Sequence, residues 1–314
     1  MTVLAISDGR AGNVRQARAL ADALAGGEAP HLRIDMTAPW RWLAPRRLPG
    51  AARGFGEGFL AAMRDPPAIV VGCGRQAALA TRLLREAGAR AVQILDPRID
   101  PRHWDCVVVP EHDRLRGDNV LTMLGSLNPV DDRWLAEARA RHPRPQAWGN
   151  GGLTALTIGG PTSAVPMTID AVAEFARQLA DETSAAGNNL AITTSGRTPR
   201  SWLPLLRSTI ARTSATLWAG EQDGPNPYAA MLAHAQHIVC TPDSVNMLSE
   251  ACATPAAVEW LPFPADGRIA AFLASLQARG RARPLGDMQA TNRIPLRETA
   301  RIAAEVSRRL QEPR

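Results

Sequence analysis

The segment TPDSVNMLSEA, residues 241–251, places two carboxylates within a pattern that is typical of a short helix. Asp243 and Glu250 are seven residues apart, close to two α-helical turns, so both side chains are expected on one side of the helix. Apolar side chains follow an i, i+3, i+7 pattern on the opposite side: Val245, Leu248 and Cys252. The apolar side would pack inward, and the acidic side would face either water or a ligand. Asp243 or Ser244 would cap the helix by accepting a hydrogen bond from its first turn.

Two other segments of the second half follow apolar runs and carry groups that suit a phosphorylated ligand. The first is IGGPTSA, residues 158–164, which contains Gly160, and the second is TTSGRTP, residues 193–199. The second segment supplies hydroxyl groups and one guanidinium: Thr194, Ser195, Arg197 and Thr198. Together with backbone N–H groups these predict a diphosphate cradle. The alternative is a plain helix cap, with Pro199 near the first turn of the following helix.

The segment DGPNPYAAMLAHA, residues 223–235, contains the single tyrosine of the chain, Tyr228. Tyr228 and Asn226 lie in a stretch that two prolines stiffen. The ring of Tyr228 would flank a base or a sugar, or it would serve only as a packing residue.

Two glycine-bearing segments of the first half also follow apolar runs. SDGRAGN, residues 7–13, would bring backbone close to a ligand and begin a helix that Asn13 caps, with Gln16 reaching back. Its candidate acceptor-side residues are Gly9, Gly12 and Asn13. VGCGRQAA, residues 71–78, repeats this design and places Arg75 in the first helical turn as an anion contact. An ordinary turn and tight strand–helix packing are the respective alternatives.

The segment PEHDR, residues 110–114, flanks His112 with two carboxylates. A histidine held in one tautomer by a carboxylate can act as a general base near neutral pH. We therefore take His112 as the first candidate for a catalytic base and Asp8 as the second. A solvated charged loop is the alternative for residues 110–114.

Composition narrows the class of protein. The chain has 314 residues, enough for two domains, and its 45% hydrophobic and 21% charged residues are typical of a folded, soluble protein. All 36 basic residues are arginine, and the surplus lies in residues 1–150, with 21 arginines against 16 acids. This charge suits an anionic acceptor or membrane surface, whereas the absence of aromatic–basic and zinc-finger patterns argues against nucleic acid. The four cysteines lack metal-ligand spacing, so no metal is expected.

Short apolar runs alternate with helical patterns along the whole chain, which predicts two doubly wound parallel sheets in the α/β class. Breakers cluster in residues 141–152, so we expect an N-terminal domain of residues 1–147 and a C-terminal domain of residues 148–314. The last helical pattern, near residues 296–310, would pack back toward the first domain. Ligands of such sheets bind at the carboxyl ends of the strands, here expected to face a central cleft.

The amino-terminal segment lacks the basic start of a signal peptide, and no apolar stretch approaches the ~20 residues that cross a bilayer. A cytoplasmic location is therefore expected. Residues 40–59, WRWLAPRRLPGAARGFGEGF, mix tryptophan and leucine with arginine. This mixture predicts either peripheral association with the inner membrane or a half-buried cationic surface helix.

Taken in order, SDGRAGNVRQA, VGCGRQAA, VVVPEHD, TTSGRTP, GPNPYAAML and TPDSVNMLSEA resemble bacterial members of the "elongated mitochondria" fission family, which is similar to GT-B glycosyltransferases. The resemblance covers almost the whole chain and implies two Rossmann-like domains, with the nucleotide sugar on the second. It assigns the diphosphate to Arg197 and the 194–198 loop and the ribose to Glu250. Asp243, Ser244 and Met247 belong to the same nucleotide-sugar site, with Asp243 and Ser244 at the start of the helix that carries Glu250. Asp243 would contact sugar hydroxyls or cap that helix.

The resemblance implies a metal-independent transferase that uses a nucleoside-diphosphate sugar as substrate, with no separate cofactor and a cell-envelope or lipid-linked acceptor. A nucleoside-diphosphate-sugar epimerase would need the same donor but no acceptor. A non-catalytic adaptor is the third hypothesis, because eukaryotic relatives are associated with recruitment of a fission factor.

Overall fold

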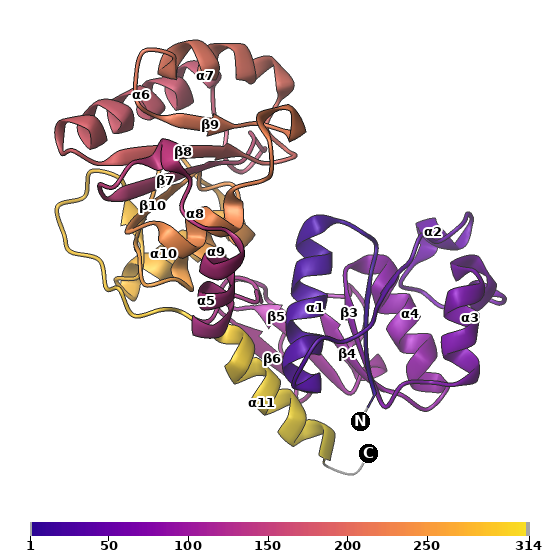
Figure 1. Ribbon diagram of the computed structural model, residues 1–314. Helices are drawn as coiled ribbons and strands as arrows, with labels where there is room; N and C mark the ends of the chain where they lie inside the picture. Colours follow the sequence, from indigo (N-terminus) through magenta and orange to yellow (C-terminus); the bar gives the residue numbers. More distant parts are fainter. Residues whose placement is uncertain (1, 312–314) are drawn as a thin grey trace. The chain divides into compact units, whose positions relative to one another are not determined.

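The computed structural model describes residues 2–311, which form two compact units (Figure 1). Unit 1 comprises the chain up to Pro129 together with the segment from Glu298 onward, and unit 2 comprises Val130–Arg297. The division thus falls earlier than the predicted boundary at residues 147 and 148. Residues 141–152 are no linker, because the Arg144 guanidinium donates hydrogen bonds to the carbonyls of Trp148 and Gly151 and folds this stretch on itself.

Unit 1 contains a six-stranded sheet in which every paired strand is parallel, in the order β2-β1-β3-β4-β5-β6. The strands are β1 (Val3–Ser7), β2 (His31–Arg33), β3 (Ile69–Cys73), β4 (Arg90–Ile94), β5 (Cys106–Pro110) and β6 (Val120–Met123). The short strand β6 at the edge of the sheet was not predicted. Strand β3 is buried along its whole length, as expected for a parallel strand that helices cover on both faces.

Two apolar layers cover the sheet of unit 1. Its α-helices are α1 (Ala11–Ala25), α2 (Trp40–Leu43), α3 (Glu57–Arg64), α4 (Arg75–Glu86) and α11 (Glu298–Gln311), with short 3-10 turns η1 (Ala51–Phe55) and η2 (Pro101–His103). Figure 1 shows α3 and α4 on one side and α1 and α11 on the other. Phe59 and Leu84 pack with Val70 on the first face, and Leu20 and Val306 pack with Val71 on the second.

Unit 2 repeats this design with the sheet order β12-β11-β10-β7-β8-β9, again all parallel. Its strands are β7 (Leu153–Ile158), β8 (Asn189–Thr194), β9 (Thr216–Trp218), β10 (His237–Cys240), β11 (Ala257–Trp260) and β12 (Arg283–Pro284). The prediction of two doubly wound parallel sheets is therefore confirmed. The two-residue strand β12 was not predicted.

The helices of unit 2 are α5 (Asp132–Arg141), α6 (Ile169–Ala185), α7 (Leu203–Ile210), α8 (Tyr228–His234), α9 (Val245–Cys252) and α10 (Gly267–Ala278), with 3-10 turns η3 (Gln146–Trp148), η4 (Arg200–Trp202) and η5 (Glu221–Asp223). Helices α6 and α7 cover one face, where Leu179 and Leu206 pack with Ile192. Helix α5 packs on α8, and Arg139 donates to the Ala233 carbonyl at 2.8 Å, which is why residues 130–147 belong to this unit.

Each sheet has one point at which the direction of the chain reverses. In unit 1 the chain passes from β1 outward to β2 and then returns to β3 on the other side of β1. In unit 2 it passes from β7 through β8 to β9 and then returns to β10 on the other side of β7. Open α/β sheets bind ligands at the carboxyl ends of the strands at such points, so ligand contacts are expected in the loops after β7 and β10 and in those after β1 and β3.

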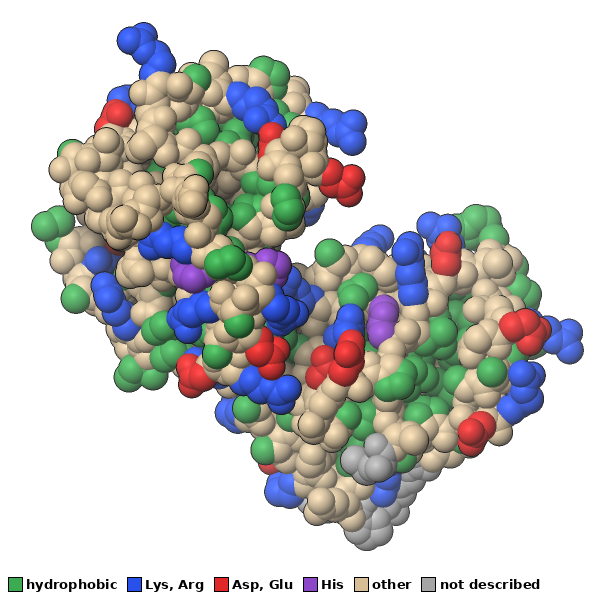
Figure 2. All heavy atoms as spheres, in the orientation of Figure 1, with side chains coloured by type: hydrophobic (Ala, Val, Ile, Leu, Met, Phe, Trp, Pro, Cys, Tyr) green, Lys and Arg blue, Asp and Glu red, His purple; other side chains and the backbone are tan. Residues whose placement is uncertain are grey.

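Helices α1 to α11, within the described residues 2–311, include none that is long and apolar enough to span a bilayer. On the face shown in Figure 2, acidic and basic side chains are interspersed over much of the surface.

Candidate functional site

The reversal point of unit 2 is built around the buried carboxylate of Asp243, which follows β10. One carboxylate oxygen, Oδ1, accepts a hydrogen bond from the Thr241 hydroxyl at 2.6 Å. The other, Oδ2, accepts from the Gly160 N–H at 3.2 Å and from the Arg197 guanidinium at 2.5 Å. The carboxylate therefore joins three loops, those after β7, β8 and β10, and fixes Arg197 above the reversal point.

Two glycines after β7 make this arrangement possible. A Cβ on Gly159 would lie 2.2 Å from both oxygens of Asp243, and a Cβ on Gly160 would lie 2.2 Å from the carbonyl oxygen of Arg197. Real Cβ atoms do not approach neighbours this closely, so any side chain at either position would push the loops apart. The two glycines, of which only Gly160 was predicted to belong to the nucleotide-sugar site, are thus needed for the close approach of Asp243 and Arg197.

The ion pair is asymmetric in its exposure to solvent. The Asp243 side chain is 0% exposed, whereas the Arg197 side chain is 50% exposed. Burial raises the pKa of the Asp243 carboxyl, and this effect outweighs the opposing hydrogen bond from Thr241 and the charge of Arg197. Arg197 therefore has one side fixed by a buried acceptor and another side that an anion from solution can reach.

The loop from Thr194 to Thr198 is held to the end of β7 by its own hydroxyl groups. Thr198 Oγ1 donates to the Gly159 carbonyl at 2.5 Å and accepts from the Ser195 N–H at 3.1 Å, and Ser195 Oγ accepts from the Arg197 N–H at 3.2 Å. These bonds fix the loop conformation. The expected helix does not follow Pro199 directly, since η4 intervenes and Pro204 occupies the first turn of α7.

Helix α9 begins after Ser244, whose hydroxyl accepts a hydrogen bond from the Met247 N–H at 3.4 Å. Ser244 is therefore the cap, and Asp243 lies before the helix instead of on its acidic side. Glu250 is 3% exposed, and its carboxylate accepts a hydrogen bond from the Tyr228 hydroxyl at 2.5 Å. The expectation that both carboxylates share an open helix side is wrong, because each is buried against a partner from another segment of the chain.

The Tyr228–Glu250 contact brings together two residues that were assigned separately to the nucleoside. Asn226 supports the tyrosine, because its side-chain oxygen accepts from the Tyr228 N–H at 2.9 Å at the start of α8. Met247 is half-buried in the first turn of α9. Helices α8 and α9 thus meet at this contact.

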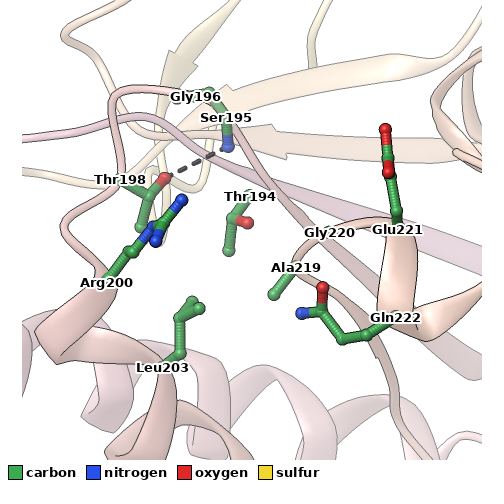
Figure 3. Close-up of a pocket in the computed structure, with 10 residues that line it drawn as sticks. All are labelled: Thr194, Ser195, Gly196, Thr198, Arg200, Leu203, Ala219, Gly220, Glu221 and Gln222. Atoms are coloured by element: carbon green, nitrogen blue, oxygen red, sulfur yellow. Dashed lines mark hydrogen bonds between the residues drawn. The ribbon is translucent and has the colours of Figure 1, made fainter.

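A cavity of about 560 Å³ opens next to this site, at the ends of β8 and β9 (Figure 3). It shares Thr194, Ser195 and Thr198 with the loop described above. Its other lining residues are Gly196, Arg200, Leu203, Ala219, Gly220, Glu221 and Gln222. Figure 3 shows the side chains of Arg200, Leu203 and Gln222 turned toward one space, whereas Glu221 points away from it.

The cavity shares the Thr194–Thr198 loop with the Asp243–Arg197 pair, and we regard the pair as the chemical centre because it lies at the reversal point. Residues 219–222, which directly follow β9, were not singled out from the sequence. The rule that selected the loops after β7, β8 and β10 applies equally to the loop that follows Trp218, and would have found Ala219–Gln222.

The reversal point of unit 1 contains Asp8 and Asn13. The Asn13 amide donates to Asp8 Oδ1 at 2.9 Å, and the Arg10 N–H donates to the same oxygen at 3.2 Å. A Cβ on Gly74 would lie 2.5 Å from the Asn13 amide nitrogen, so the loops after β1 and β3 approach as closely as those of unit 2. Beside them, burial and the charge of Asp8 raise the pKa of the Cys73 thiol well above its usual range.

The prediction that Asn13 caps α1 is wrong. Helix α1 begins at Ala11 with Arg10 at the cap position, so Gly12 and Asn13 lie inside its first turn and the side chain of Asn13 is available for Asp8. Gly9 has a positive φ of 80°, and a Cβ there would lie 2.5 Å from the Arg33 side chain.

Arg75 begins α4 and is exposed. Its guanidinium donates a hydrogen bond to the Arg41 carbonyl oxygen at 3.4 Å.

His112 follows β5 at the same edge of the sheet as Asp8 and is half-buried. Strands β1 and β5 are separated by β3 and β4, which puts Asp8 and His112 roughly 14 Å apart at ~4.8 Å per strand. The two candidate bases are therefore alternatives, since they are too far apart to act on one proton.

Metal ligation does not emerge from the described part of the chain. Between residues 2 and 311, no three His, Cys, Asp or Glu side chains are grouped so that they could hold an ion.

Comparison with known proteins places the chain in a family. The family model described as Mitochondrial fission ELM1 matches residues 11–310. The chain belongs to this family. It is 27% identical over 286 residues to the mitochondrial fission protein ELM1 of Arabidopsis thaliana, covering 79% of this chain and 65% of that protein. It is 25% identical over 299 residues to the uncharacterized protein RP120 of Rickettsia prowazekii, with 81% of each chain covered.

Solved structures of low sequence identity share the fold. The UDP-GlcNAc 2-epimerase of Methanocaldococcus jannaschii aligns over 100% of this chain and 94% of its own, with a TM-score of 0.56 and 12% identity. The Neisseria meningitidis UDP-GlcNAc 2-epimerase bound to UDP-GlcNAc aligns over 99% of this chain and 93% of its own, with a TM-score of 0.53 and 12% identity. The spinosyn forosaminyltransferase SpnP aligns over 99% of this chain and 95% of its own, with a TM-score of 0.51 and 15% identity. The chain thus has a GT-B-like fold.

Proposed function

We propose that unit 2 binds a nucleoside-diphosphate sugar and that the protein transfers the sugar, without a metal, to a cell-envelope or lipid-linked acceptor. The observation that carries this proposal is the half-exposed Arg197, which the buried Asp243 holds at the reversal point of a doubly wound sheet. The GT-B-like fold supports it, because proteins of this fold include a UDP-GlcNAc 2-epimerase bound to UDP-GlcNAc and a forosaminyltransferase.

The chemistry of sugar transfer explains why a fixed cation is useful here. Breaking the bond between the anomeric carbon and the diphosphate oxygen leaves negative charge on the departing diphosphate. A guanidinium held in place before the reaction stabilises that charge without reorganisation, and so do the N–H groups at the start of a helix such as α9. Asp243 would act as a positioning residue, because its side chain is closed to solvent and touches the ligand only through Arg197.

The remaining contacts of the ligand follow from the neighbouring groups. In this proposal Glu250 and Tyr228 bind the nucleoside, and its ribose competes with the Tyr228 hydroxyl for the Glu250 carboxylate. The 560 Å³ cavity is within the size range of small-molecule pockets, so it has room for a sugar or a base. The base that activates the acceptor remains a prediction, with His112 first and Asp8 second.

The proposal is tested first by ligand binding. Nucleoside diphosphates and their sugars are screened by thermal shift and isothermal titration calorimetry on the wild type, Arg197→Ala and the control Arg212→Ala. Arg212 is an exposed arginine of the same unit that lies outside the Thr194–Thr198 loop. A ligand at 100 times its dissociation constant should stabilise by about 2.7 kcal/mol. Loss of this stabilisation in Arg197→Ala but not in Arg212→Ala is the expected result.

The products then separate the functional classes. Release of the nucleoside diphosphate that depends on an acceptor supports a transferase, whereas conversion of the sugar without any acceptor identifies an epimerase. If no nucleotide or nucleotide sugar binds the wild type, the enzyme hypothesis fails and the non-catalytic adaptor takes its place.

A further inference from the structure

Helix α2 of unit 1 carries the most prominent exposed apolar side chains of that unit among its described residues. Trp42 is 69% exposed and its neighbour Leu43 is 42% exposed. Trp40, in contrast, points inward: its indole N–H donates to the Pro49 carbonyl at 3.0 Å, and its ring lies against Gly54. The segment is therefore folded around Trp40 in a way that presents Trp42 and Leu43 to the solvent.

The chain around these two residues is basic. No acidic residue occurs between Asp35 and Glu57, and the four arginines of that stretch are all exposed: Arg41, Arg46, Arg47 and Arg53. The exposed Arg75 lies beside them through its hydrogen bond to the Arg41 carbonyl. Acidic residues neutralise only part of this charge, since Arg47 pairs with Glu86 at 3.1 Å. Around the position that α2 has in Figure 1, Figure 2 shows hydrophobic and basic side chains with acidic atoms among them.

We propose that residues 37–56, with α2 at their tip, dock unit 1 on an anionic phospholipid surface. The Trp42 indole suits the boundary between headgroups and acyl chains, and the arginines suit lipid phosphates. Two exposed apolar side chains on a four-residue helix are far too little for the ~800 Å² that each partner buries in a stable protein interface. A weak, reversible contact with a charged surface needs no more than one such insertion together with several basic groups.

The test uses the full chain without any nucleotide, so its outcome is independent of the proposed transferase activity. Flotation is measured with vesicles of phosphatidylcholine alone and of phosphatidylcholine mixed with phosphatidylglycerol, at low and physiological ionic strength. The wild type should bind only the anionic vesicles and should bind less tightly as salt rises. Each arginine near the surface contributes about fivefold to the partition coefficient, so Arg41→Ala with Arg46→Ala should weaken binding roughly thirtyfold.

The apolar contribution has a matched control. Trp42→Ala with Leu43→Ala should reduce partitioning at least as much as loss of the arginines, while Trp42→Phe should retain most of it. Arg293 and Ile294 of unit 2 are also an exposed arginine and an exposed apolar residue, with Ile294 73% exposed. Arg293→Ala with Ile294→Ala should therefore bind vesicles like the wild type.

Circular dichroism and the melting temperature check that the variants fold. Because Trp42 and Leu43 are exposed, their substitution is expected to leave the fold intact. Failure of the folded wild type to float with anionic vesicles would overturn the proposal. Equal binding to neutral vesicles, or equal loss in the control variant, would overturn it as well.

Discussion

The Arg197–Asp243 pair allows a prediction in which charge, burial and hydrogen bonding contribute separately. Arg197→Ala removes a half-exposed cation from a carboxylate that keeps its bonds from Thr241 and Gly160. Asp243→Asn keeps the shape but leaves one acceptor oxygen to face three donors. The double variant retains two neutral donors around a neutral amide.

The exposure of the two partners sets the size of each effect. Breaking a fully buried pair costs about 3–5 kcal/mol and breaking an exposed pair about 0–1, so Arg197→Ala, with one partner of each kind, should cost about 1–2 kcal/mol. Asp243→Asn should lower the free energy of unfolding by about 1–3 kcal/mol, because one of the groups that donate to the carboxylate would then face the amide NH2 group instead of an acceptor oxygen. The double variant has no arginine facing the new amide. Its loss of unfolding free energy should therefore be about 1 kcal/mol smaller than the sum of the losses in the two single variants.

The sign of the pH dependence follows from the raised pKa of Asp243. The folded state holds its proton to a higher pH than the unfolded state, whose pKa is near 3.8, so the carboxyl destabilises the fold increasingly as pH rises through the folded pKa. Arg197 limits this destabilisation. Arg197→Ala should therefore be more harmful at pH 7 than below the folded pKa, by about 1.4 kcal/mol for each unit by which its loss raises that pKa.

Hydrogen–deuterium exchange resolved by peptide measures these free energies for unit 2 alone. The amides of β10 report the opening of unit 2 after correction for intrinsic exchange rates, and those of β3 in unit 1 are the internal control. Additive penalties in the double-mutant cycle, or an Arg197→Ala penalty that is the same at acidic and neutral pH, would refute the reasoning.

Three more predictions concern unit 2. Tyr228→Phe should lower the free energy of unfolding by about 1–3 kcal/mol in urea denaturation, because the buried Glu250 loses its hydroxyl donor; a change near zero would show that the contact is unimportant. Arg281→Ala should cost at least about 2 kcal/mol, since this buried guanidinium donates to backbone carbonyls at the end of α9, and unchanged exchange of α9 amides would contradict that role. Burial raises the pKa of the Cys240 and Cys252 thiols to about 12, so iodoacetamide at pH 8 should label them about a thousandfold more slowly than in the unfolded chain; rapid labelling of the native protein would disprove their burial.

The hydrophobic pattern alone was sufficient for most of the fold. Apolar runs such as residues 106–109 and 153–158 lie in buried strands. The helical spacings within residues 14–24 and 169–179 lie in α1 and α6. These features are local, because a parallel strand between two helical layers must be apolar on both faces. The strand pattern also predicted polar groups for ligand binding in the loops that follow the strands. The Asp243–Arg197 pair lies in those loops.

The boundary between the units, in contrast, could not be predicted from a local sequence pattern. The breakers of residues 141–152 resemble a linker in composition, but Arg144 folds them and α5 packs on α8. Likewise, the spacing of Asp243 and Glu250 implied a shared open side of one helix, whereas each carboxylate is buried against a side chain from another segment of the chain.

The sequence by itself determined the fold class, the family and the loops in which polar chemistry is concentrated, because these depend on periodicity and on short segments. The tertiary structure decided which of those groups meet. Arg197 reaches Asp243 across 46 residues of chain, and Gly160 reaches it across 83. Whether a carboxylate faces a ligand or an arginine from another loop depends on how the loops of neighbouring strands converge at one edge of a sheet. No single segment of the sequence specifies the order of the strands.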